Sequence, residues 1–114
     1  MENGGSKFFA HLERIYEVRL GWKISVERVP QGMRVSASAE CWYLLSTSQL
    51  LADRLWKQLK EAAKAVSYGI EADMLDQRRW WWTVADPVSA IRVLASFVGV
   101  TCSDAEARLV WIGL

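Results

Sequence analysis

The chain has 114 residues, of which 52% are hydrophobic and 24% charged, and this size and composition fit one soluble globular domain. Its formal charge of +1 and mean hydropathy of +0.04 exclude a strongly basic duplex-coating protein, a disordered chain and a collagen. No stretch approaches the roughly 18 consecutive apolar residues of a membrane span, and the first residues do not resemble a signal peptide, so we expect a cytoplasmic protein without membrane attachment.

The chain begins with a polar stretch and then shows helical periodicity. Residues 1–5 are expected to form a disordered lead, followed by a single α+β domain over residues 6–114. Ser6 can cap a helix from Lys7 to about Leu20, because apolar side chains recur there every three or four positions. The predicted buried stripe consists of Phe8, Phe9, Leu12, Ile15, Tyr16 and Leu20.

After Gly21 the hydrophobic period changes to two, which is typical of strands. In residues 22–29 the apolar Trp22, Ile24 and Val26 alternate with polar side chains. Residues 30–32, Pro-Gln-Gly, supply a turn, and residues 33–40 alternate in the same way. The two segments therefore predict an antiparallel hairpin with one polar face.

A second helix is predicted from the serines near residue 46 to about Tyr68. Ser46 and Gln49 have capping-box spacing, Ser48 is an alternative cap, and Gly69 is the expected end. The apolar stripe of this helix consists of Leu51, Leu55, Leu59, Ala62 or Ala63, and Val66.

The C-terminal half combines strand and helix patterns. We expect a weak strand from Ile70 to about Leu75, a turn at Asp76-Gln77, and a strand over 78–85 rich in β-forming side chains. Asp86-Pro87 predicts the start of a third helix that ends at Gly99. The apolar residues within 106–112 predict a final strand.

The resulting order is α-β-β-α-β-β-α-β. It predicts an α+β fold in which three helices pack on one face of an antiparallel sheet of four to five strands. The other face of the sheet would remain available to solvent or a ligand.

The sequence contains no recognisable catalytic or metal-binding pattern. His11 is the only histidine and has no evident partner, and the acidic pairs Glu71/Asp73 and Asp104/Glu106 fit a solvated surface. Cys41 and Cys102 stand alone and are expected to be buried, reduced side chains. We therefore expect neither an enzyme nor a bound metal or cofactor.

One local feature stands out: Arg78, Arg79, Trp80, Trp81 and Trp82 are consecutive. In a strand, Trp80 and Trp82 project from one face and Trp81 from the other, so at least one indole must lie on the uncovered face. Burial of all three in the core or in dimer contacts is the alternative interpretation.

Exposed tryptophan beside arginine suits single-stranded nucleic acid, whose bases stack on aromatic rings while cations contact the phosphates. The near-neutral charge of the chain does not favour tight duplex binding. Other residues that can extend this predicted surface are Lys23, Arg34, Trp42 and Tyr43.

These features resemble the ThermoDBP-related proteins of hyperthermophilic archaea. The resemblance covers approximately residues 7–112 and rests on element order, tryptophan-rich strands and scattered basic residues. It implies binding of single-stranded DNA or RNA in an aromatic cleft flanked by basic residues, with Arg78, Arg79 and Trp80 to Trp82 in that role. Fuller family members carry a leucine zipper, and the present sequence contains no heptads.

A protein-interaction or assembly subunit, including a homodimer, is the second hypothesis, because tryptophan and arginine are also preferred anchors of protein interfaces. A homing-endonuclease-like half domain is a third, suggested by the β-β-α order, but the acidic metal-binding motif of such nucleases is missing.

Overall fold

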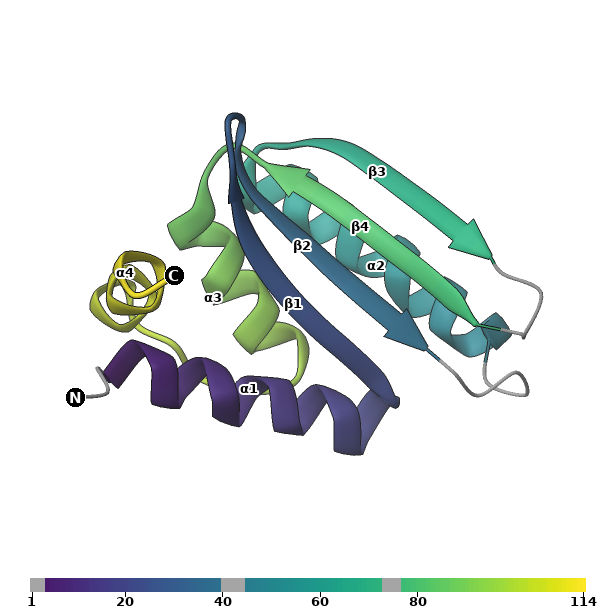
Figure 1. Cartoon of the computed structure of the whole chain (residues 1–114), viewed down its shortest axis with the longest axis horizontal. Coiled ribbons are helices and arrows are strands. Elements are labelled where there is room, and N and C mark those ends of the chain that lie inside the picture. The colour runs from purple at the N-terminus through teal and green to yellow at the C-terminus, as the bar shows by residue number, and fades with distance from the viewer. Residues whose placement is uncertain (1–3, 40–44, 73–76) are drawn as a thin grey trace.

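The computed structural model describes residues 4–39, 45–72 and 77–114, and within these residues it contains four helices and four strands. In chain order they are α1 (Gly4–Leu20), β1 (Trp22–Val29), β2 (Gly32–Ala39), α2 (Leu45–Ala63), β3 (Ala65–Ala72), β4 (Arg78–Val84), α3 (Pro87–Phe97) and α4 (Asp104–Ile112) (Figure 1).

The strands form one antiparallel sheet in the order β1-β2-β4-β3. Because β4 lies between β2 and β3, the sheet joins a hairpin from the first half of the chain to strands from the second half. The predicted α+β class with an antiparallel sheet is confirmed. The predicted number of helices and the predicted last strand are wrong, as described below.

The helices lie on one side of the sheet, and Figure 1 looks onto the other side, with α2 behind the strands and α3 next to β1. Trp22 is the centre of the core between the two layers. Its indole stacks on Trp80, Trp82, Tyr16 of α1 and Phe97 of α3, with ring centroids 5.5–6.5 Å apart. A single buried aromatic side chain therefore joins β4 and two helices to β1.

The predicted hairpin of residues 22–29 and 33–40 is confirmed over the described residues. Ile24 lies opposite Ala37 and Val26 opposite Val35, and these side chains face the helices. Gly21, the predicted end of α1, has a φ of 67°, a conformation that glycine adopts without steric cost. α1 itself begins at Gly4, so the predicted cap Ser6 lies inside its first turn.

The second helix is shorter than predicted, because α2 ends at Ala63 and residues 65–72 form β3. The backbone N–H groups of Ala85 and Asp86 donate to the carbonyls of Lys64 and Ala63, at 3.0 and 3.1 Å. These bonds satisfy carbonyls at the end of the helix, and Lys64 leaves the helical conformation with a φ of 53°.

The predicted caps of α2 are also wrong, since the helix begins at Leu45 and both Ser46 and Ser48 lie within it. Ser48 is buried, and its hydroxyl accepts a hydrogen bond of 3.1 Å from the Trp22 indole. Its role is therefore to satisfy a buried N–H group rather than to start the helix.

The C-terminal segment predicted as a strand is the helix α4. Ser103 and Glu106 form a capping box, in which each side chain accepts a hydrogen bond from the backbone N–H of the other. Ala107 and Val110 are buried on one side of the helix, while Leu109 and Ile112 are exposed. The i, i+3 spacing of the buried residues suits a helix that packs against α1 and α3. The sequence does not reveal this spacing, because consecutive apolar residues surround it.

α3 starts as the sequence predicts, with Asp86 as N-cap and Pro87 in the first turn. The Asp86 carboxylate accepts hydrogen bonds from the backbone N–H and the hydroxyl of Ser89, at 3.2 and 2.7 Å. These bonds hold the pKa of Asp86 below its usual value. Ile91, Leu94 and Val98 are buried, as predicted.

Arg28 fastens α4 to the end of β1. Its guanidinium lies 3.8 Å from the centre of the Trp111 ring and donates hydrogen bonds to the carbonyls of Trp111 and Leu114.

No helix in the described part of the chain is long and apolar enough to cross a membrane.

Candidate functional site

The uncovered side of the sheet, here called the open face, is built of three rows of cross-strand neighbours. The middle row contains Ser25, Ser36, Trp81 and Gly69, from β1, β2, β4 and β3. A second row contains Lys23, Ser38, Arg79 and Glu71, and a third contains Glu27, Arg34, Thr83 and Ser67. One large aromatic side chain thus stands in a row of small residues, between two charged rows.

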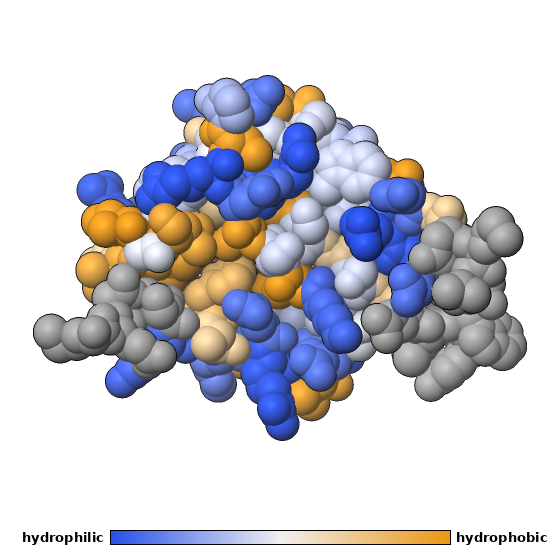
Figure 2. Space-filling view, in the orientation of Figure 1, coloured by the Kyte–Doolittle hydropathy of each residue, from blue (hydrophilic) through white to orange (hydrophobic). Residues whose placement is uncertain are grey.

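Figure 2 shows this side of the molecule in space-filling form. Hydrophilic side chains spread over the sheet, whereas hydrophobic side chains gather on the side where α4 lies. The open face is therefore mainly polar around its aromatic side chain.

Trp81 lies across Gly69 of the neighbouring strand. A Cβ atom added to Gly69 would lie 2.1 Å from both Cε2 and Cζ2 of the indole and 2.4 Å from its Nε1. Three adjacent ring atoms at similar distances mean that the ring covers the glycine, and only a residue without a side chain leaves room for it. The half-buried indole therefore has one side against the sheet and keeps part of its surface exposed.

The two arginines of the open face are held by weak ion pairs. Arg79 lies 4.0 Å from Glu71, and Arg34 lies 3.9 Å from Glu27, in both cases between partly exposed side chains. Exposed pairs at such distances contribute little free energy, typically about 0–1 kcal/mol. Both guanidinium groups can consequently exchange their carboxylate for another anion at small cost.

Two buried hydrogen-bonding atoms on this face, Arg34 Nε and Thr83 Oγ1, have no hydrogen-bond partner among the described residues. Arg34 and Thr83 are cross-strand neighbours. A buried donor or acceptor without a partner is unfavourable. The arrangement of Arg34 beside Thr83 therefore has unused hydrogen-bonding capacity.

Arg78 faces the other way, because it is the neighbour of Ala39 and Ala72 on the helix side of the sheet. It is half-buried, and its Nε has no hydrogen-bond partner in the part of the chain that the structure describes. Together with Ser38, Glu71, Gln77 and Arg79 it lines a small pocket of about 50 Å³ at the end of β4. The two consecutive arginines therefore approach one small pocket from opposite faces.

Trp80 and Trp82 are fully buried under the helices and cannot touch a ligand on the open face. The Trp80 indole donates to Gln49 Oε1 at 3.1 Å, and Gln49 Nε2 donates to Asp53 and to the Tyr68 hydroxyl. Tyr68 stacks on Trp82, with ring centroids 5.7 Å apart. Burial, with a smaller effect of the Asp53 carboxylate, raises the pKa of Tyr68 to about 12. This network fixes β4, and with it the position of Trp81.

The other predicted site residues are only partly placed on the open face. Lys23 and Arg34 lie on it, on β1 and β2, whereas Trp42 and Tyr43 fall outside the described residues. Sequence reasoning missed Gly69, which was interpreted as the end of a helix. The signal that could have revealed it is the alternation of Val66, Tyr68 and Ile70, which has the period of a strand.

Among the described residues, no three His, Cys, Asp or Glu side chains come together in a way that could hold a metal ion. Comparisons with protein-family models, curated proteins and solved structures found no match for the chain. The resemblance to the ThermoDBP-related proteins therefore stays a prediction.

Proposed function

We propose that the protein binds single-stranded nucleic acid, DNA or RNA, on the open face, without catalysing a reaction. The observation that carries the proposal is the Trp81 indole, which lies on Gly69 and is only partly buried, with Arg79 and Arg34 in the adjacent rows. An unpaired base can stack on the ring while the phosphates on either side contact the arginines.

The spacing of the rows supports this mode of binding. Residues two apart in a strand, such as Arg79 and Trp81, are separated by roughly 6–7 Å, which is close to the distance between neighbouring phosphates of an extended single strand. A duplex offers no unpaired base for stacking, and among the described residues the open face has three cations, Lys23, Arg34 and Arg79, alongside two carboxylates. The surface thus favours a few phosphate contacts combined with stacking.

A protein partner on the same surface is the second hypothesis, but the residue types of the open face are less suited to it. The cores of protein interfaces are depleted in charge and combine several apolar side chains. Several exposed large aliphatic residues lie elsewhere: Leu109 and Ile112 are on α4, and Ile70 faces the helix side of the edge strand β3. A protein partner would therefore find more apolar area away from Trp81.

Fluorescence anisotropy with end-labelled single-stranded and double-stranded DNA and RNA tests the proposal. We expect tighter binding of single strands than of duplex, and a loss of about 1–3 kcal/mol of binding free energy in Trp81→Ala. The matched control is Arg54→Ala, which removes an exposed cation of α2 on the other side of the sheet. Equal affinity for duplex, or unchanged single-strand affinity in Trp81→Ala, would reject the proposal in favour of a protein partner.

A further inference from the structure

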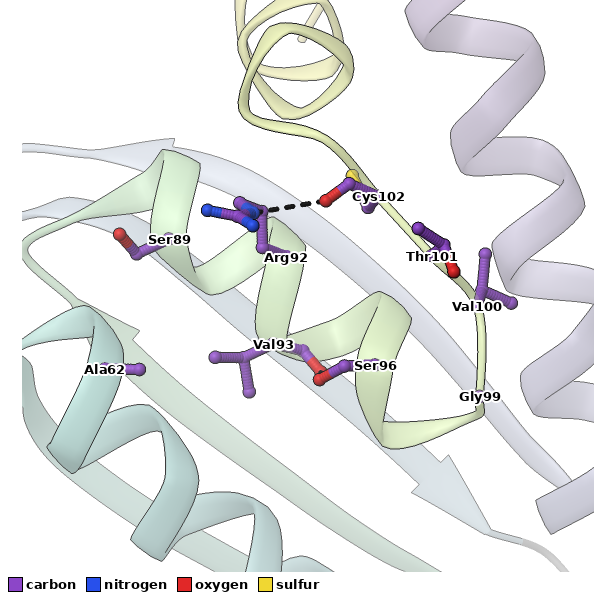
Figure 3. A pocket seen from close by; sticks show the side chains of 9 residues that line it. All are labelled: Ala62, Ser89, Arg92, Val93, Ser96, Gly99, Val100, Thr101 and Cys102. Atoms are coloured by element: carbon purple, nitrogen blue, oxygen red, sulfur yellow. Dashed lines mark hydrogen bonds between the residues drawn. The ribbon is translucent and has the colours of Figure 1, made fainter.

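A groove of about 550 Å³ lies on the helix side of the molecule, away from the open face. Figure 3 shows that α3 forms its floor, that Ala62 of α2 lies on one side, and that the connection from α3 to α4 lies on the other. Its volume is within the range of roughly 300–1,000 Å³ that is typical of small-molecule sites.

Arg92 supplies the positive charge of this groove. Its Nε donates a hydrogen bond of 3.1 Å to the carbonyl of Cys102, which ties the guanidinium to the connecting segment (Figure 3). Its two terminal nitrogens have no hydrogen-bond or ion-pair partner in the described part of the chain. A guanidinium held at one nitrogen and open at the other two can donate a pair of parallel hydrogen bonds to an oxyanion.

The hydroxyl groups of the groove add acceptors. Ser89 donates its hydroxyl hydrogen to Asp86 at 2.7 Å, and Ser96 donates its own to the carbonyl of Val93 at 3.2 Å. Both oxygens therefore retain lone pairs for donors on a ligand. The exposed Thr101 hydroxyl in the opposite wall can donate or accept.

The remaining surface of the groove is apolar or uncharged. Ala62, Val93 and Val100 provide apolar contacts. Burial, together with the charge of Glu106, raises the pKa of the Cys102 thiol, so this side chain is neutral near neutral pH. Arg92 is therefore the one charged group among the residues that line the groove.

We propose that this groove binds a small organic oxyanion, a carboxylate or a phosphate ester, that also carries hydroxyl groups. The anionic group pairs with the terminal nitrogens of Arg92, and the ligand hydroxyls donate to Ser89 and Ser96. Val93 and Val100 contact its carbon skeleton. This binding is independent of the proposed nucleic-acid interface, because the two surfaces lie on opposite sides of the sheet.

Nuclear magnetic resonance titrations of the amide groups test the proposal with four probes: ribose 5-phosphate, glycerate, inorganic phosphate and ribose. We expect the two hydroxylated anions to shift the amides of residues 92–102 saturably, at least one of them about tenfold more tightly than inorganic phosphate or ribose. A stronger response to ribose 5-phosphate would identify a phosphate ester, and a stronger response to glycerate a carboxylate.

Arg92→Gln should weaken binding of the preferred probe by about tenfold or more, as expected for loss of a charged hydrogen-bonding partner. Arg54→Gln on α2 is the matched control and should leave the affinity for the preferred probe unchanged. Arg92→Lys keeps the charge without the bond to Cys102, and should bind with intermediate affinity. Unfolding curves of each variant establish that the domain is intact.

Three results would overturn the proposal: no saturable shifts at millimolar probe, shifts confined to the open face around Trp81, or equal affinity in Arg92→Gln. Inorganic phosphate binding as tightly as both organic anions would also contradict it, because the ligand hydroxyls would then have no role. Oligonucleotide binding is measured in a separate experiment. A negative result for the groove would therefore not contradict the proposed binding of nucleic acid on the open face.

Discussion

Three consecutive tryptophans of β4 have different surroundings, which allows them to be compared within one strand. Trp80 and Trp82 have no exposed surface, whereas Trp81 is half-buried on the open face. We expect Trp82→Ala to lower the free energy of unfolding by about 3–5 kcal/mol, the usual cost of removing a buried large aromatic side chain. Trp81→Ala should cost clearly less. Urea unfolding monitored by circular dichroism measures both, and equal losses would contradict the assignment of faces.

The close contact between Trp81 and Gly69 leads to a second prediction at the residue scale. Gly69→Ala introduces a methyl group where the indole lies, so the ring must move and single-strand affinity should fall. In the Trp81→Ala background the same substitution should have no effect on binding and should be neutral or stabilising, since the space is then open. A double-mutant cycle measures this coupling, and additive effects would show that the ring does not depend on the glycine.

Arg79 allows charge to be separated from stacking. The logarithm of the affinity for a single strand falls with the logarithm of salt concentration by about 0.7 for each phosphate contact. Arg79→Ala should therefore reduce this slope by about 0.7, and Arg79→Lys should preserve it. Glu71→Gln removes the carboxylate 4.0 Å from Arg79 and should tighten binding at low salt. Anisotropy titrations across salt concentrations check these values, and an unchanged slope in Arg79→Ala would exclude a phosphate contact there.

At the scale of elements, α4 depends on its capping box. Ser103→Ala removes the acceptor of the Glu106 N–H, and we expect it to lower the free energy of unfolding by about 0.5–2 kcal/mol. The exposed Thr101→Ala, two residues earlier in the same connection, is a suitable control. Chemical unfolding measures the change, and no loss of stability in Ser103→Ala would indicate that packing alone holds α4 in place.

The elements with strict periodicity or unambiguous end signals could be predicted from the sequence. The alternation of residues 22–29 identified the hairpin, and Asp86-Pro87 identified the start of α3, because both patterns have one local physical cause. α4 was misassigned, although Ser103 and Glu106 have the spacing of a capping box. The run Leu109-Val110-Trp111-Ile112 is apolar on every side, so its periodicity does not distinguish strand from helix.

The end of α2 depends on contacts that no local pattern contains. The carbonyls of Ala63 and Lys64 are satisfied by the backbone of residues 85 and 86, which are distant in the sequence. Helical periodicity continued to Val66, and Gly69 looked like a plausible stop. Tertiary hydrogen bonds outweighed that local preference, and the residues beyond Lys64 became an edge strand.

In the candidate site too, features that depend on local strand geometry could be predicted, and features that depend on tertiary contacts could not. Opposite faces for Trp80 and Trp81 follow from strand geometry alone, and the sequence predicted them. Which face is covered, and that Gly69 lies beneath Trp81, depend on the pairing of β3 with β4. The groove beside Arg92 was not anticipated, because its walls come from α2 and from the connection between α3 and α4.

At the scale of the whole molecule, the raised pKa values of two tyrosines lead to a prediction of how the free energy of unfolding varies with pH. Burial raises the pKa of Tyr16 and raises that of Tyr68 to about 12, compared with an ordinary value of 10.0. The folded state therefore holds these protons more tightly than the unfolded state. Their contribution to stability is complete below about pH 10, and it is lost as the pH rises through about 12 for Tyr68.

Urea midpoints measured from neutral to strongly alkaline pH should consequently fall above about pH 10. Tyr68→Phe is the comparison that isolates one group, since lysines also titrate in this range. The variant should start from a lower stability, because it lacks the hydrogen bonds with Gln49 and Asp53, and should then fall less steeply. Parallel curves for the two proteins would contradict the raised pKa of Tyr68.

The position of β4 between β2 and β3 also determines when the domain can fold during its own synthesis. A ribosome that has released only the first two helices and three strands exposes β2 with an unpaired edge, and Trp22 without Trp80, Trp82 and Phe97. Non-local strand pairing of this kind delays folding until the distant partner is available. The apolar face of the hairpin therefore stays uncovered, and able to associate with other chains, until residues 78–97 have emerged. This is the interval in which a holding chaperone would be most useful.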